Sequence, residues 1–209
     1  METSERLKTI DEQLAVLRRL DPDLTGFGAA KHSYRLNPVA SEEAVAAFES
    51  THGVGLPSGY RAFVTRLGNG GAGPWYGLEP LENGTYDDLD SKSGPIDLGA
   101  PFPHQKAWNM DLQIEGDERY ESIEDEYFDP KWVCGLIRIA NYGCGISLNL
   151  VVNGDEYGNV WVDDRCNDGG IYPDPFFHRE ERTDFLTWYE LWLDLAVQDL
   201  EKRHASGRV

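Results

Sequence analysis

Three short motifs in this 209-residue chain contain the residue types of catalytic or ligand-binding sites. Residues 68–73 (GNGGAG) match GxGxxG, in which backbone N–H groups hold a dinucleotide pyrophosphate at the N-terminus of a helix. Here the helical pattern precedes the glycines, so the nearest helix end is a C-terminus, whose partial negative charge repels phosphate. We therefore expect a structural turn in which the glycines supply positive φ angles.

A serine and a group of aspartates are the other two candidates. Ser147 falls one residue short of the GxSxG pattern that presents a nucleophilic serine, and the residues around it alternate as in a continuing strand. We expect Ser147 to be a polar residue on the open face of that strand. Asp163, Asp164 and Asp168 could supply ligands to a metal-dependent hydrolase, but Cys166 stands where a calcium loop needs an oxygen ligand. Such a hydrolase is the least favoured of three functional hypotheses.

The cysteines and histidines do not have the spacing of a metal site. Cys134, Cys144 and Cys166 form no CxxC pair, and the five histidines form no HExxH or similar pattern. We expect no metal and no cofactor, and cysteines that pack as small buried hydrophobic residues. An odd cysteine count and the lack of a signal-peptide pattern favour the reducing cytoplasm.

Charge excludes one large class of partners. The chain has 19 Lys and Arg against 37 Asp and Glu, which gives a net charge of −18 at pH 7. Direct binding of DNA or RNA needs the opposite sign, because Lys and Arg neutralise the phosphates. The most apolar run, around 185–200, is interrupted by three acidic residues and does not predict a membrane span. A cationic protein partner best matches the negative electrostatic field of this chain.

The elements that position these motifs follow from the spacing of apolar side chains. Leu7, Ile10, Leu14 and Leu17 recur at helical intervals, which predicts an amphipathic helix over about 4–20. The other expected elements are helices at about 41–53, 57–68 and 183–200, strands at 136–140, 146–152 and 160–162, and a turn entering a strand at 68–81. The last two strands should pair as a hairpin. This order predicts a single α+β domain with an antiparallel-rich sheet flanked by several helices.

The strongest charge feature is the acidic segment from Asp111 to Asp129, in which Arg119 alone opposes nine carboxylates. Such a segment is either a solvated face or an electrostatic docking patch that speeds association with a basic partner. The aromatic residues within it either anchor an interface or face the core. The candidate partner-binding residues are Glu115, Asp117, Glu118, Tyr120, Glu121, Glu124, Asp125, Glu126 and Tyr127.

A series of motifs resembles the SMI1/KNR4 family of the SUKH superfamily. They are LPSGYRAF at 56–63, LGNGG at 67–71, GPWYGL at 73–78, GCG at 143–145 and GNVW at 158–161, within a likeness over about 36–195. The residues that match the family pattern are Gly68, Asn69, Gly70, Gly71, Gly73, Pro74, Tyr76, Gly77 and Trp161. We interpret them as fold-defining residues rather than contact residues.

The resemblance implies a SUKH-like domain over 36–200, preceded by a helical extension (1–35), followed by a tail (201–209), and without catalytic residues. Bacterial members are mostly intracellular immunity proteins that bind and block a cognate polymorphic toxin, often a nuclease; fungal relatives are regulatory interaction proteins. The resemblance thus implies a non-enzymatic cytoplasmic immunity protein whose partner is a basic toxin domain. The alternative is a regulatory or scaffold adaptor that recruits an endogenous protein, with the N-terminal helix as an appended binding element.

Overall fold

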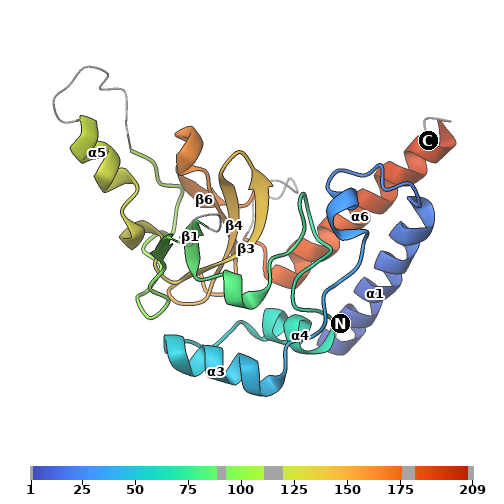
Figure 1. Ribbon diagram of the computed structural model, residues 1–209, viewed down its shortest axis with the longest axis horizontal. Helices are drawn as coiled ribbons and strands as arrows, with labels where there is room; N and C mark the ends of the chain where they lie inside the picture. Colours follow the sequence, from blue (N-terminus) through green and yellow to red (C-terminus); the bar gives the residue numbers. More distant parts are fainter. Residues whose placement is uncertain (1, 89–92, 111–119, 176–181, 207–209) are drawn as a thin grey trace.

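The computed structural model describes residues 2–88, 93–110, 120–175 and 182–206 and has the expected α+β architecture (Figure 1). The helices are α1 (Thr3–Leu20), α2 (Ala29–His32), α3 (Glu42–His52), α4 (Ser58–Arg66), α5 (Tyr120–Tyr127) and α6 (Phe185–Ala205). The strands are β1 (Tyr86–Asp88), β2 (Ser93–Pro95), β3 (Leu136–Gly143), β4 (Ile146–Val151), β5 (Val160–Asp163) and β6 (Ile171–Pro173). Three 3-10 turns are η1 (Leu81–Asn83), η2 (Pro130–Val133) and η3 (Arg165–Asn167).

The central element is an antiparallel sheet in the order β3, β4, β5, β6, and β1 pairs separately with β2. Leu148 pairs with Val162 and Leu150 with Val160, which confirms the predicted hairpin of β4 and β5. A second hairpin joins β3 to β4 through Cys144, which has a left-handed φ of 51°. The sheet is therefore built from neighbours in sequence, as expected for antiparallel strands joined by short turns.

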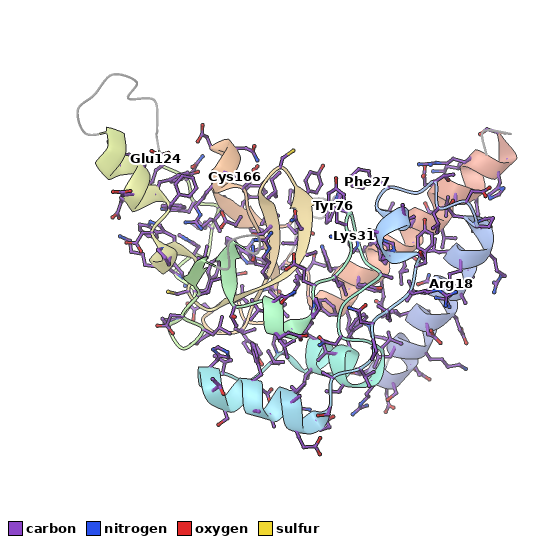
Figure 2. All side chains as sticks on the ribbon, in the orientation of Figure 1. Arg18, Phe27, Lys31, Tyr76, Glu124 and Cys166 are labelled. Carbon is purple, nitrogen blue, oxygen red and sulfur yellow. The ribbon has the colours of Figure 1, made fainter. Side chains whose placement is uncertain are left out.

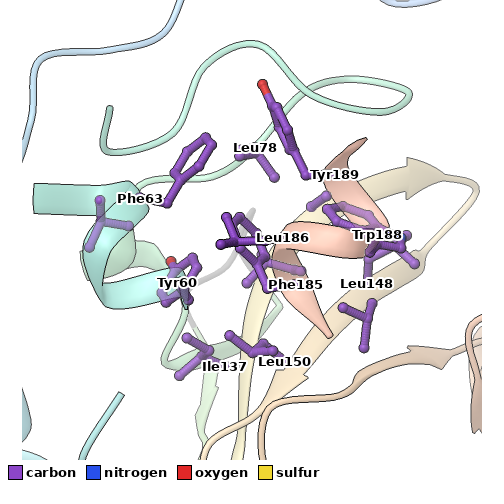
Figure 3. Packing of buried hydrophobic residues seen from close by; sticks show 14 of the residues in the cluster. Tyr60, Phe63, Leu78, Ile137, Leu148, Leu150, Phe185, Leu186, Trp188 and Tyr189 are labelled. Atoms are coloured by element: carbon purple, nitrogen blue, oxygen red, sulfur yellow. The ribbon is translucent and has the colours of Figure 1, made fainter. Parts of the chain in front are cut away.

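One face of the sheet packs against α4 and α6 (Figure 3). Leu148 and Leu150 of β4 face Phe185 and Trp188 of α6, and all four side chains are buried. Phe63 of α4 packs edge-on against Phe185, with ring centroids 5.2 Å apart. Aromatic pairs in this geometry contribute more than their buried area alone.

The opposite face of the sheet is also covered, so the expectation that Ser147 lies on an open face is wrong. Ser147 is 7% exposed and Asn149 is 3% exposed, and the Asn149 amide donates to the Ser147 hydroxyl oxygen at 3.0 Å. Trp161, which pairs with Asn149 across the strands, packs edge-on against Phe102 at 4.9 Å. The alternation of polar and apolar residues was a correct strand signal, but on this face the polar side chains satisfy one another under a cover of loop residues.

The first helix lies beside the last one, and the two run parallel (Figure 1). Near the start of both helices, Arg6 donates to both carboxylate oxygens of Glu190, each at 2.8 Å. Near the C-terminal ends of both helices, the His204 ring nitrogen Nε2 lies 2.6 Å from the carbonyl oxygen of Leu20. The polar contacts therefore fix both the orientation and the register of this pair.

The predicted amphipathic stripe of α1 is confirmed. Leu7, Ile10, Leu14 and Leu17 are buried, and they belong to the same hydrophobic cluster as the sheet and α6. Because these four side chains of α1 are buried in this cluster, we infer that α1 contributes to the stability of the fold.

We expect Leu14→Ala to lower the free energy of unfolding by about 2–5 kcal/mol, because the deletion leaves a cavity between α1 and the core. Urea unfolding monitored by tryptophan fluorescence measures this. The matched control is Glu12→Ala, an exposed position on the same helix. Equal stability of the two variants would show that α1 does not pack as described.

Candidate functional site

The acidic helix α5 is attached to the sheet by a buried arginine. Arg165 is 2% exposed, and its guanidinium forms a bidentate pair with Asp163 at 2.9 and 2.7 Å. Its Nη1 also donates to the carbonyl oxygen of Tyr127 at 3.1 Å. A buried ion pair is tolerated when further hydrogen bonds satisfy its remaining protons, and here those bonds end on the α5 segment. Arg165 therefore fixes where α5 leaves the sheet.

A stack of aromatic rings completes this attachment. Tyr127 stacks on Trp108 with centroids 5.7 Å apart, and Trp108 lies 4.6 Å from Trp132. The Trp132 indole N–H donates to the carbonyl oxygen of Glu126 at 2.8 Å, and the Tyr127 hydroxyl donates to the Asn109 side chain at 2.7 Å. Burial raises the pKa of Tyr127 to about 12. Its side chain is 0% exposed, so its prediction as a partner-contacting residue is wrong: this aromatic ring packs in the core.

The acidic residues at the C-terminal half of α5 point away from that core. Glu124, Asp125 and Glu126 are exposed, and Glu126 pairs with Lys131 at 2.6 Å. Figure 2 shows Glu124 at the outer end of the molecule. Three other predicted positions, Glu115, Asp117 and Glu118, lie outside the described residues, and the Tyr120 and Glu121 side chains are not described.

The glycine motif forms a closed loop and not the predicted entry to a strand. Gly71 and Leu78 exchange backbone hydrogen bonds, with N–O distances of 2.8 and 2.7 Å. Gly71 has φ +100° and Gly77 φ +93°, and a Cβ on Gly77 would lie within 2.3 Å of the Gly71 carbonyl oxygen. Asn69 holds the loop exit, since its side-chain oxygen accepts from the Leu81 N–H at 2.8 Å. A side chain at either glycine has no room, which explains the residue type there.

The other residues of the family pattern lie within or against this loop and the sheet. Tyr76 is 41% exposed, whereas Trp161 is 0% exposed. The remaining positions are Gly68, Gly70, Gly73 and Pro74. The exposure of Tyr76 was not expected, because the sequence places it in the same short motif as the packed glycines.

An aromatic groove of about 500 Å³ opens beside this loop, between α6 and residues 26–27. We define it by Phe27, Trp75, Tyr142, Trp192, Leu195 and Asp199, which lie along its walls. Phe27 is 67% exposed and packs against Tyr76 at 5.4 Å, and Leu195 is 44% exposed. Figure 2 shows Phe27, Tyr76 and Lys31 together on one side of the molecule. Exposed apolar side chains that gather in a hollow are typical of binding surfaces.

Sequence reasoning missed this groove because its walls come from four separate segments. One signal was present: Phe27 stands alone between two glycines in the link after α1, where no periodic pattern asks for an aromatic residue.

Two of the three aspartates proposed for metal chemistry, Asp163 and Asp164, have structural partners. Asp163 pairs with Arg165, while Asp164 accepts from the Asn167 amide at 2.7 Å and from the Tyr172 hydroxyl at 3.2 Å. In the described ranges, no group of three or more His, Cys, Asp or Glu side chains is arranged to hold a metal ion. Within the same part of the chain, no helix is long and apolar enough to cross a membrane.

The cysteines do not pack as predicted. Cys144 and Cys166 are exposed, and Cys134 is half-buried. The Cys166 thiol donates to the Cys144 carbonyl oxygen at 3.2 Å, which places Cys166 of η3 against the β3–β4 turn. Both exposed cysteines lie in turns, and connecting segments usually run over the protein surface, which overrides the tendency of cysteine to be buried.

We expect Arg165→Met to destabilise the fold by about 3–5 kcal/mol, because Asp163 is then buried without its partner. Hydrogen exchange should also rise across 120–133, since the bond to Tyr127 is lost. Urea unfolding and hydrogen-exchange mass spectrometry measure the two effects. Arg66→Met, at an exposed position on α4, is the control. Unchanged exchange over 120–133 would contradict this role of Arg165.

Stability should fall on acidification through His32, which supports the glycine loop. Its Nδ1 accepts from the Tyr34 N–H at 3.0 Å, and burial lowers its pKa to about 4. Below pH 6.5 the unfolded chain binds a proton that folded His32 does not, so stability is lost as the pH falls towards 4. Between pH 7.5 and pH 5 the free energy of unfolding should fall by about 2 kcal/mol through this group. His32→Asn should reduce the pH dependence of urea unfolding by that amount; an identical pH dependence would refute it.

Comparison with known proteins gives one family and no individual relative. No curated protein and no solved structure matches the chain. The model of the SMI1 / KNR4 family (SUKH-1) matches residues 39–189, which include the glycine motif, the four-stranded sheet and the first turn of α6. This match covers more than half of the chain. The chain therefore belongs to the SMI1/KNR4 family (SUKH-1).

Proposed function

We propose that this chain is a non-enzymatic, cytoplasmic protein-binding domain of the immunity type, which binds a basic cognate toxin domain and neutralises it. The observation that carries the proposal is membership of the SMI1/KNR4 family, which supports an immunity-like or related domain. The net charge of −18 supports a basic protein as the partner.

The charge suits a toxin that is a nuclease. A nuclease groove that holds nucleic acid has to be cationic, because it neutralises phosphates. Glu124 and Asp125 are exposed at the end of α5, and neither forms an ion pair within the described residues. These carboxylates are therefore available to cations of a partner, and such complementarity accelerates association more than it raises affinity.

The adaptor hypothesis depended on the N-terminal helix as a separate binding element. The apolar face of α1 is instead buried against α6 and the core. No feature of the described structure favours that hypothesis over an immunity-type domain, and it becomes an outcome of the experiment.

The experiment is an affinity pull-down of the tagged chain from its native host, at low and moderate salt, supplemented with inactive toxin domains encoded nearby. A stoichiometric, salt-sensitive toxin supports the proposal. Recovery of host regulatory proteins alone supports the adaptor, and failure to retain any basic protein contradicts the immunity-type function.

We expect charge reversal on α5, Glu124→Lys with Asp125→Lys, to slow association with the captured partner by about tenfold at low salt, because the steering field is lost. The salt dependence of the association rate should weaken as well. Surface plasmon resonance measures both. The control is Asp11→Lys with Glu12→Lys, which changes the net charge equally on exposed positions of α1. If both double variants slow association equally, total charge matters and α5 is not the docking patch.

A further inference from the structure

We propose that a polar hollow next to the glycine loop binds a phosphate group, either as free phosphate or as part of a small phosphorylated molecule. The hollow has a volume of about 420 Å³ and lies between the α2 segment, the glycine loop and β3. We define it by the six polar side chains on which the proposal depends: Lys31, Arg35, Tyr76, Glu79, Asn83 and Asn141. The ligand is a small molecule, so this proposal is independent of the protein partner proposed above.

Two cationic side chains, Lys31 and Arg35, line this hollow. Both are exposed, and within the described residues neither forms an ion pair or donates a hydrogen bond. The Lys31 ammonium lies 5.6 Å from the centroid of the Tyr76 ring, and Figure 2 shows the two residues on one side of the molecule. This contact holds the ammonium in place and leaves its N–H groups available to an acceptor. Two such cations in one hollow favour an anion as its ligand.

Two side-chain amides add neutral hydrogen-bond donors to the same hollow. The Asn141 side-chain oxygen accepts from the Gly143 N–H at 2.7 Å, which fixes the orientation of this amide. Its Nδ2 group donates to no acceptor in the described part of the chain. Asn83 is half-buried, and its side chain forms no hydrogen bond within those same ranges. A partly buried donor needs an acceptor from solvent or from a ligand, so both amides are available to a bound anion.

Glu79, the acidic residue of this set, is already paired with a cation. Its carboxylate lies 3.5 Å from the Arg138 guanidinium, and the two side chains are 13% and 8% exposed. The charge of Glu79 therefore does not cancel those of Lys31 and Arg35. The chain as a whole carries a net charge of −18, but exposed charges more than about 8 Å apart are largely screened at physiological salt. The cations inside the hollow thus act on a bound ligand more strongly than distant carboxylates do.

A phosphate group matches these donors better than other ligand groups do. A phosphomonoester carries a charge of about −1.5 to −2 near pH 7 and three acceptor oxygens, so it can pair with two cations and still accept from an amide. A carboxylate carries a single charge and two oxygens. An apolar ligand would bury the donors without supplying an acceptor, which costs free energy. The volume of the hollow falls in the range of about 300–1,000 Å³ that is typical of small-molecule sites.

The test is isothermal titration calorimetry of the full chain, in a buffer without phosphate or sulfate. The ligands are inorganic phosphate, ribose 5-phosphate, ribose and succinate. We expect at least one of the two phosphates to bind with a dissociation constant of about 1 mM or tighter, and ribose to show no binding. Binding of inorganic phosphate at least as tight as that of ribose 5-phosphate supports free phosphate as the ligand. Tighter binding of ribose 5-phosphate supports a phosphorylated molecule.

Lys31→Gln and Arg35→Gln should each weaken binding of that phosphate about 5- to 10-fold, because each removes a charge-assisted hydrogen bond. Asn83→Ala should weaken it about threefold without any change of charge. The controls are Lys8→Gln and Arg66→Gln, which each remove one positive charge at an exposed position outside the hollow. Both controls should bind as the parent chain does, and thermal unfolding verifies that every variant is folded.

Several results would overturn the proposal. One is a dissociation constant weaker than about 1 mM for both phosphates, and another is succinate that binds as tightly as they do. Equal weakening by Lys31→Gln and Lys8→Gln would show that total charge, and not the hollow, controls binding. Binding unchanged by both Lys31→Gln and Arg35→Gln would show that the phosphate binds elsewhere on the chain. None of these measurements involves a protein partner, so their outcome is separate from that of the pull-down.

Discussion

The central sheet requires cover on both of its faces, and the rest of the fold follows from how that cover is provided. Helices α4 and α6 cover one face with aromatic and aliphatic side chains. The other face carries Ser147, Asn149 and Asp163, so its cover has to satisfy polar groups as well as exclude water. Arg165 does both, because it pairs with Asp163 inside the fold and bonds to the carbonyl of Tyr127.

These two covers carry two candidate binding surfaces. The buried Tyr127 anchors the last turn of α5. Glu124 and Asp125, which come just before it in the sequence, are exposed. The aromatic groove lies along α6, beside the glycine loop, which falls within the residues matched by the family model. Steering by charge and anchoring by aromatic contact are separate tasks in an interface, and the fold assigns them to different layers.

Periodicity in the sequence was sufficient for α1, α3, α4 and α6 and for the β4–β5 hairpin, since apolar spacing directly reports which side chains are buried. It did not predict the short helices α2 and α5. It failed where burial depends on distant residues. Ser147 has the pattern of an open strand face, yet residues far along the chain cover it. Tyr127 stands among acidic residues, and its neighbours do not show that Trp108 stacks on it. The groove combines residues 27, 75, 142 and 195, and its one local signal was Phe27 between two glycines.

The measurement that tests the account most directly is a hydrogen-exchange footprint of the chain in complex with its captured partner. We predict protection at the end of α5 and at the two groove segments, residues 26–28 and 195–203, with α3 exchanging as in the free chain. Protection confined to α3, with no change at α5 or the groove, would contradict it, because the partner would then bind neither the acidic end of α5 nor the aromatic walls of the groove.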